Sequence, residues 1–553
     1  MVDGGFYDTI PAFSGQTARP RIMNLLPLFP LVIPLFGSVL FWVWPRLRWS
    51  LAEKGVYLGA LLLTVLSLLL VGGQVAHVPK VTISPEAMLW NEGLMFDYGA
   101  LNTTLALALA IPLLLSEMGR PFERPRGRLR LLTVGLGVLA CTSGNLLGIC
   151  LAWGAIDLVN LFVLRQSAEG QIERRSGRWA ITSFLSTLVL VVATVFLAVD
   201  RGHTRLDVTT ASWTVLSWLA LAAFLRLAPW PLQSNYASLT LAHQSLVLGG
   251  GLWLRLAPGL VAGGGRLEPS LAALLILASS LLALVASRDG GPYLLLPGTG
   301  LLVLAPLSGS PMGKGAGILV LVSLSLLCGY WEMLPWLERS LPDALSRYAR
   351  APLLLGLAGA PLAIGFGAHL SALTALSTPW PGAWLVVGLG LTLLDAALWR
   401  RWLGSQEIEA QEEPSRVERY LTWGAAGALC LAILAVGVAP RLLSGTGGEP
   451  FGWGELMAAP GAWWRAVAVS LLPLALGFGL AWSLARRTSI LGEIVAWLGT
   501  FVELDWLYAG IEGGFARIGR WSAFALAQVE GGLALVWTIC WWVALALLMV
   551  GDA

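Results

Sequence analysis

A succession of apolar stretches runs along almost the whole of this 553-residue chain. A helix that crosses a lipid bilayer needs about 20 mostly apolar residues. We expect sixteen such helices, over residues 25–44, 56–76, 98–116, 129–142, 145–164, 179–199, 211–229, 237–257, 270–287, 292–308, 315–335, 351–375, 383–399, 420–438, 463–484 and 529–550. Charged residues make up 12% of the chain, about half the share found in soluble proteins. The sequence therefore predicts an all-α polytopic membrane protein and excludes a soluble enzyme.

The composition excludes further kinds of function. The 35 basic and 32 acidic residues give a net charge of +3, and no basic run is interleaved with aromatic residues, which excludes nucleic acid as a partner. The five cysteines lie in apolar stretches without a C-x-x-C motif, so we expect no metal, no cofactor and no catalytic redox residue. Only Lys54, Lys80 and Lys314 are lysines, and all three fall between the expected helices.

Basic residues are distributed unevenly over the connecting loops. If residue 1 lies outside, the inner loops hold 24 of the 35 lysines and arginines, the outer side holds 10, and Arg226 remains within the membrane. Cytoplasmic loops are enriched in these residues. We expect a multi-pass protein of the bacterial cytoplasmic membrane with its N-terminus on the outer side.

The expected regions follow one another along the chain without a strand pattern. They are a soluble tail (1–22), N-terminal helices (23–128), two repeats (129–257 and 270–400), C-terminal helices (401–484), a lateral segment (485–528) and a final helix (529–553). The lateral segment mixes charged residues with Trp, Phe and Leu, which predicts an amphipathic helix along the membrane surface. The acidic inner loop over 402–419 is expected to be a solvated linker, with a docking surface as the alternative.

Six ionisable residues stand out within the expected membrane helices. They are Asp157, Arg226, His243, Glu332, His369 and Asp395. An ionisable side chain in lipid costs about 3 kcal/mol or more unless it is paired or hydrated, so each is a functional candidate. We regard the first three and His369 as a proton relay or gate, with Glu332 and Asp395 as accessory candidates.

Two of these residues stand beside expected helix breaks. Arg226 precedes Pro229 and Pro231, and His369 follows Gly359, Pro361 and Gly365. Proline interrupts the hydrogen-bond ladder of a helix, and inverted-repeat transporters place interrupted helices where ions cross the membrane. We therefore expect broken helices in both halves, although ordinary proline kinks remain the alternative.

Four motifs carry a resemblance to a known family. They are GLAGAPLAIGFGAHL (356–370), SGNLLGICLAWGAIDLVNLFVL (143–164), FLRLAPWPLQ (224–233) and ELDWLY (503–508). In order and spacing they resemble the antiporter-like subunits of respiratory complex I and their relatives in Mrp antiporters and membrane hydrogenases. The likeness is greatest to the largest such subunit, which has sixteen helices and a lateral helix before the last.

The resemblance implies roles for individual residues. The family pairs a glutamate on the fifth helix with a lysine on the seventh and continues through lysines or histidines to the twelfth helix. Here Gly154 stands at the glutamate position and Asp157 one turn later, Arg226 at the lysine position, and His369 at the twelfth-helix position. His243 falls near the family's histidine after the first break.

The relay implied by the resemblance lacks its central lysines. The stretches over 286–296 and 318–331, which correspond to the central helices, contain neither lysine nor histidine. Arginine cannot exchange its proton in a protein, whereas histidine can. Arg226 can therefore organise charge and water, and proton transfer falls to Asp157, His243 and His369.

A structural interpretation stands beside each functional one. Asp157 and Arg226 are as well explained by a static ion pair, and His243 by packing next to Gln244. Glu332 near a helix end is expected to reach the membrane interface, and Asp395 to pair with Arg400 near the inner surface.

Three functions remain open at this point. The first is a subunit of a multi-subunit complex that translocates protons, or Na+, through hydrated half-channels. The complex could be a relative of NADH–quinone oxidoreductase, a cation antiporter, a membrane hydrogenase or an inorganic-carbon uptake complex, with all redox chemistry in other subunits. The second is a degenerate scaffold or anchor, which predicts a dry gap between His243 and His369. The third is a stand-alone carrier of a small solute.

Overall fold

The computed structural model describes most of the expected membrane part of the chain. The described residues are 26–43, 50–73, 81–83, 94–120, 124–166, 171–206, 211–229, 239–264, 268–285, 291–310, 312–377, 379–403, 415–440 and 461–485, with isolated positions between 493 and 521. The chain forms two units, Met1–Gly492 and Glu493–Ala553. The expected tail at 1–22, the final helix and nearly all of the lateral segment lie outside the described residues.

The first unit is built almost entirely of helices. Its first half contains α1 (Phe29–Val43), α2 (Ser50–Gly73), α3 (Ala100–Met118), α4 (Arg124–Thr142), α5 (Leu146–Gln166), α6 (Gln171–Arg201), α7 (Trp213–Leu227) and α8 (Leu239–Ala262). Its second half contains α9 (Pro269–Val285), α10 (Leu296–Leu304), α11 (Gly313–Ser340), α12 (Asp343–Ser346), α13 (Ala351–Ala358), α14 (Ile364–Ser377), α15 (Ala383–Leu403), α16 (Arg416–Val438), α18 (Ala462–Val469) and α19 (Leu471–Ala485).

Every expected helix up to 463–484 overlaps an observed helix or pair of helices. The expectation that no strand occurs is wrong, because Val81–Ile83 (β1) pairs antiparallel with Leu94–Phe96 (β2). The range over 292–308 contains the short α10 between two 3₁₀ turns, and the range over 463–484 is divided at Ser470 into α18 and α19.

The surface of this unit is that of a membrane protein. Nine of the described helices are long and apolar enough to cross a bilayer, and shorter apolar helices accompany them. Large apolar side chains are exposed on their outer faces, as at Leu70, Leu188 and Leu431, where 58–68% of the side chain is accessible. Helices satisfy their own backbone groups, which lipid cannot do. The expected all-α polytopic membrane fold is confirmed.

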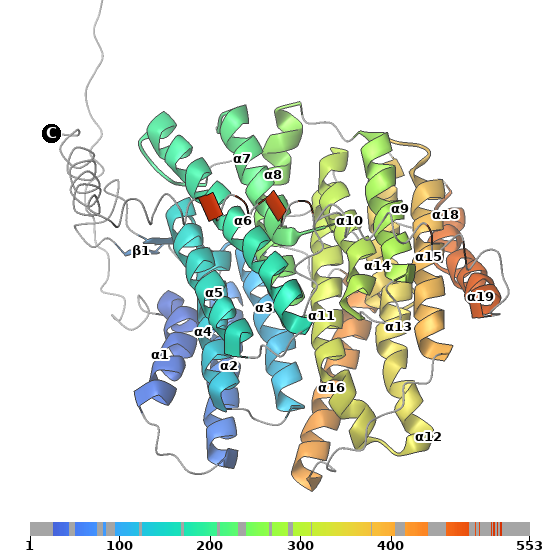
Figure 1. Cartoon of the computed structure of the whole chain (residues 1–553), viewed down its shortest axis with the longest axis horizontal. Coiled ribbons are helices and arrows are strands. Elements are labelled where there is room, and N and C mark those ends of the chain that lie inside the picture. The colour runs from blue at the N-terminus through green and yellow to red at the C-terminus, as the bar shows by residue number, and fades with distance from the viewer. Residues whose placement is uncertain are drawn as a thin grey trace, which may run out of the picture. The chain divides into compact units, whose positions relative to one another are not determined.

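Helix α11 lies between the two halves of the bundle (Figure 1). It packs against α3, α8, α14 and α16, and its apolar window is entirely buried. Its 28 residues span about 42 Å at 1.5 Å per residue. Helix α11 therefore joins the two halves, which also contact each other directly where α3 packs against α16.

Candidate functional site

Helix α7 ends inside the bundle, beside the middle of α8. Its C-cap residue Ala228 adopts a left-handed conformation with φ of 45° and donates its backbone N–H to Phe224 O. Pro229 follows, and a residue before proline is disfavoured in the right-handed helical region. A Cβ added at Gly249 of α8 would lie only 2.5 Å from Leu227 N, so the two backbones touch there. The break expected at Pro229 is therefore present, while Pro231 lies outside the described residues.

The residue before this break, Arg226, forms a buried ion pair with Asp157 of α5. Arg226 Nη1 lies 2.5 Å from Asp157 Oδ1, and the two side chains are 2% and 0% exposed. Two hydroxyls of α6 also hydrogen-bond to the Asp157 carboxylate. Ser183 Oγ donates to Oδ1 and Thr187 Oγ1 donates to Oδ2, each at 2.7 Å. The guanidinium also lies over the Trp153 ring, 4.9 Å from its centroid. Both charges are thus compensated inside the bundle.

The geometry around Thr187 connects Asp157 with the position of Gly154. Thr187 Oγ1 donates to Asp157, and Thr187 Cγ2 would be the nearest atom to a Cβ at Gly154, at 3.9 Å. Residues three apart on a helix share a face. Gly154 and Asp157 therefore both face the same part of α6, and there is open space for a side chain at Gly154.

His243 of α8 is held by a carbonyl group that a proline leaves free. Pro112 of α3 has no N–H, so the carbonyl of Ala108, four residues earlier, lacks its helical partner. Ser325 Oγ of α11 donates to this carbonyl, and His243 Nε2 lies 3.1 Å from it and 2.6 Å from Ser325 Oγ. His243 thus joins α3, α8 and α11 in the centre of the bundle.

Glu332 is buried inside the bundle. Helix α11 continues for two turns beyond it, to Ser340, and Glu332 is 2% exposed. Its carboxylate accepts hydrogen bonds from Thr240 Oγ1 at 2.6 Å and Ser116 Oγ at 3.3 Å, and lies 3.4 Å from Arg120 Nη1. Arg120 also donates to the Glu332 carbonyl.

The sequence interpretation missed the rest of this charged cluster. Glu117 pairs with Arg130 and lies 3.7 Å from Arg120, and Lys54 Nζ donates to Arg120 O at 2.7 Å. Lys54 was expected in a loop, but α2 begins at Ser50, so Lys54 lies in its first turn and is 6% exposed. Lys314 likewise lies in α11. The Glu117 and Arg120 spacing of three residues was the available signal.

The second break separates α13 from α14. Gly359 caps α13 with φ of 69°, Pro361 follows, and Leu362 also has a positive φ of 72°. Gly365 lies in the first turn of α14 rather than in the break. A Cβ added at Gly365 would collide with the carbonyl of Gly356. The expected break is present, and Gly365 serves the close approach of its two halves.

His369 and Asp395 differ from the other candidates. Each has buried polar side-chain atoms without a hydrogen-bond partner among the described residues. His369 is 6% exposed and its Nδ1 is unpartnered, next to Gly359. Asp395 is 0% exposed and both of its carboxylate oxygens are unpartnered. The expected Asp395–Arg400 pair is wrong. Residues five apart do not share a helix face, and Arg400 Nη1 donates to Leu284 O at 3.2 Å.

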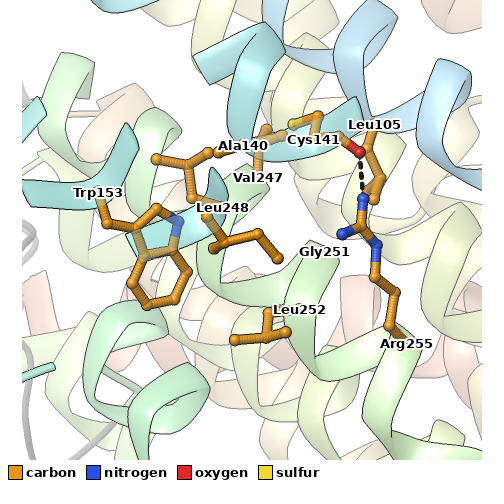
Figure 2. A pocket seen from close by; sticks show the side chains of 10 residues that line it. Leu105, Ala140, Cys141, Trp153, Val247, Leu248, Gly251, Leu252 and Arg255 are labelled. Atoms are coloured by element: carbon orange, nitrogen blue, oxygen red, sulfur yellow. Dashed lines mark hydrogen bonds between the residues drawn. The ribbon is translucent and has the colours of Figure 1, made fainter. Parts of the chain in front are cut away.

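A small cavity of about 10 Å³ extends from Trp153 toward Arg255, near the size that holds one water. Figure 2 shows these two side chains on either side of Leu248 and Leu252, with Arg255 reaching the Cys141 carbonyl. The indole nitrogen of Trp153 and Nε of Arg255 are buried without a partner among the described residues. The ring that supports Arg226 therefore also borders a polar space.

The candidates thus form two groups on either side of α11. Asn160 Nδ2 donates to Gln244 Oε1 at 2.8 Å, which connects the helix of Asp157 with that of His243. Most buried residues of α11 are apolar, such as Leu327 beside Gly356 of α13, although Ser323, Cys328 and Tyr330 are also buried there. In the described residues, no group of three His, Cys, Asp or Glu is placed to hold a metal ion.

Comparisons with known proteins were made for sequence and for structure. No protein-family model and no curated protein matches the sequence. A chain of the Mrp complex from Dietzia sp. DQ12-45-1b is similar over 93% of this chain, at 16% identity and a TM-score of 0.68, and this chain spans 63% of that longer chain.

Two further similar structures come from respiratory complexes. A chain of the archaeal membrane-bound sulfane sulfur reductase matches at 15% identity and a TM-score of 0.69, covering 95% of this chain and 100% of its own. A chain of respiratory complex I from Thermus thermophilus matches at 17% identity and a TM-score of 0.61. The match covers 82% of this chain and 99% of the complex I chain. The expected fold is therefore confirmed, and this chain has the fold of the antiporter-like membrane subunits of the Mrp and complex I assemblies.

Proposed function

We propose that this chain is a membrane subunit of a multi-subunit, ion-coupled complex and that it translocates protons. In this proposal it lies in a bacterial cytoplasmic membrane with its N-terminus outside, and the driving chemistry belongs to partner subunits. The similar structures are chains of an Mrp complex and of two respiratory complexes, which supports the assignment to an assembly.

The observation that carries the proposal is the buried Asp157–Arg226 pair at the interrupted end of α7. The pair is compensated by Ser183, Thr187 and Trp153. An ionisable pair in lipid is costly and is typically retained for an ion pathway. Its place at a helix that stops beside the middle of α8 corresponds to the interrupted helices of transporters.

The chemistry divides these residues into two roles. Arg226 keeps its proton, so it acts as a fixed charge that stabilises ionised Asp157. When a proton reaches Asp157, the attraction weakens and Arg226 is released toward Trp153. His243 and His369 can exchange protons, since imidazole can both accept and release a proton, which arginine cannot.

Proton flux in vesicles containing the purified intact complex tests the proposal. Asp157→Asn and His369→Ala should each lower the flux, by about 100-fold or more if the residue transfers protons directly. Asp200→Asn is a matched control, because Asp200 lies at the end of α6 with its side chain 49% exposed. His203→Ala is the corresponding histidine control. Wild-type flux in both Asp157→Asn and His369→Ala would reject the proposal.

A swap of positions tests whether Asp157 does the work expected at Gly154. The double variant Gly154→Glu, Asp157→Ala moves the carboxyl by one turn on the same face, into the open space beside Thr187. We expect it to regain most of the flux that Asp157→Ala loses. Gly154→Ala with Asp157→Ala is the control for packing. Equal flux in the two double variants would show that no carboxyl is needed on this face.

One observation favours the alternative of a scaffold subunit. The buried residues of α11, which lies between His243 and the second break, are mostly apolar and include no lysine or histidine. A scaffold predicts that the complex assembles normally and that no variant of this chain alters flux. The flux measurements above therefore decide between the two functions.

A further inference from the structure

Asp395, in the middle of α15, is an unusual residue for a membrane helix. Its side chain is 0% exposed and neither carboxylate oxygen has a hydrogen-bond partner among the described residues. Buried carboxyl groups in native proteins are nearly always partnered, and an ionised one in lipid carries a large cost. Asp157, by contrast, has partners for both oxygens.

Asp395 is one of the residues that line a cavity of about 270 Å³ between α13, α15 and α19. The walls are otherwise apolar or indole, from Leu354 and Ala358 of α13, Trp399 and Trp402 of α15, and Leu474 of α19. This volume is far above the roughly 10–15 Å³ that one water needs. The cavity therefore has room for several waters around a single polar group.

No charged side chain of the surrounding helices is directed at this carboxyl. Helices α9, α13 and α19 contain no charged residue. On α15, Arg400 donates to Leu284 O and Arg401 lies over the Trp331 ring, 5.2 Å from its centroid. The remaining basic or titratable groups on the packed elements are His369 of α14, Arg465 of α18 and Tyr293 of the 3₁₀ turn Gly291–Leu295, and none of them is within hydrogen-bond distance of Asp395.

The chemistry of this site selects a proton as its ligand. A metal cation such as Na+ needs several oxygen ligands, and the cavity offers the oxygens of one carboxyl. A carboxyl buried in apolar surroundings without a partner is favoured in its neutral, protonated form. It can ionise when water enters the cavity and solvates the charge.

The cavity adjoins His369 through the end of α13. Ala358 lines the cavity, and the next residue, Gly359, lies against Nδ1 of His369. The end of α13 therefore lies between His369 and the cavity that Asp395 lines.

We propose that Asp395 is a proton-binding carboxyl that exchanges its proton with water in the α13–α15–α19 cavity and continues the path from His369. The second clause rests on the proposed function, whereas the first does not.

A lipid-soluble carbodiimide tests the proton-binding carboxyl directly. Dicyclohexylcarbodiimide adds across its C=N bond to a protonated carboxyl, with the oxygen bonding to carbon and the proton moving to nitrogen, and the product rearranges to a stable N-acylurea. We expect mass spectrometry of the treated complex to find one such adduct on Asp395, and none at this position in Asp395→Asn. Absence of the adduct in the wild-type complex would overturn the proposal.

A second variant leaves the carboxyl in place and fills the cavity. Leu474→Trp adds an indole from α19 to the space that Asp395 lines. We expect it to reduce the adduct, while Leu472→Trp on the exposed face of α19 leaves it unchanged. An equal adduct in Leu474→Trp and the wild type would contradict the role of the cavity.

Proton flux separates this inference from the proposed function. Asp395→Asn should lower flux by about tenfold or more, and Asp395→Glu should retain most of it, with assembly of the complex checked by size-exclusion chromatography. If Asp157→Asn abolishes flux and Asp395→Asn does not, the path through Asp395 is wrong and the proposed function stands. If the wild-type complex moves no protons, the proposed function and the path through Asp395 both fail, and the adduct decides the proton-binding carboxyl alone.

Discussion

The two interrupted regions of the bundle use the same backbone device but leave their polar groups in opposite states. In each, a helix ends in a left-handed residue with a proline after it, Ala228 before Pro229 and Gly359 before Pro361. At the first break, Asp157 is paired and hydrogen-bonded through both oxygens. At the second, His369 Nδ1 and both oxygens of Asp395 have no partner among the described residues.

This difference shows that a break alone does not define a site. The first region stores two opposite charges that stabilise one another, so removing either charge leaves the other uncompensated. The second region holds groups that favour their neutral forms because nothing pairs with them. A proton entering the first region has to disrupt an ion pair, whereas one entering the second only needs water to reach the carboxyl.

The largest expected effect is that of Asp157→Asn on stability. Removing one partner of a buried ion pair leaves Arg226 uncompensated, at a cost of about 3–5 kcal/mol. Denaturant unfolding of the purified protein in detergent micelles measures this loss. Asp200→Asn, on an exposed side chain, should change the free energy of unfolding by less than about 0.5 kcal/mol.

A double variant makes this prediction specific to the pair. Arg226→Gln combined with Asp157→Asn removes both charges, so it should be more stable than either single variant. If the double variant loses as much free energy of unfolding as the two single variants together, the 2.5 Å contact between the two side chains does not stabilise the protein.

Asp395→Leu is expected to act in the opposite direction. The substitution replaces an unpartnered carboxyl by an apolar side chain in an apolar cavity, which should raise the free energy of unfolding by about 1–3 kcal/mol. The same unfolding experiment measures it. A loss as large as that of Asp157→Asn would show that Asp395 is compensated in the native state, and the contrast between the two regions would disappear.

Much of this architecture was predictable from the sequence because lipid imposes it. Bilayer thickness sets helix length, and backbone groups must be satisfied within each helix, so the expected ranges coincide with the observed helices. The Asp157–Arg226 pair was predictable for a similar reason, since two opposite charges in lipid need one another.

The remaining features depend on packing between distant segments. Pro112 indicates that the Ala108 carbonyl is free, but nothing in the sequence shows that Ser325 and His243 would reach it. The burial of Glu332 was not predicted, because α11 is longer than its apolar stretch. The Asp395–Arg400 pair was inferred from nearness in sequence, whereas a spacing of five residues directs the two side chains to different faces.

The smallest expected effect on stability is that of Ser325→Ala, beside His243. His243 lies between the two regions, and this variant tests whether it behaves like the paired groups of the first region. Ser325→Ala removes the hydroxyl that donates to the Ala108 carbonyl and lies 2.6 Å from His243 Nε2. The Ala108 carbonyl still accepts a hydrogen bond from His243. The free energy of unfolding should therefore fall by only about 1 kcal/mol, the contribution of one ordinary hydrogen bond. Ser323→Ala, at a buried position two residues earlier on α11, is the matched control. If Ser325→Ala also lowers proton flux while Ser323→Ala does not, His243 belongs with the paired groups of the first half, because its function then depends on a fixed partner. Unchanged flux with the expected loss of stability would place His243 among the packing residues, and the path from Asp157 to His369 would have to cross α11 elsewhere.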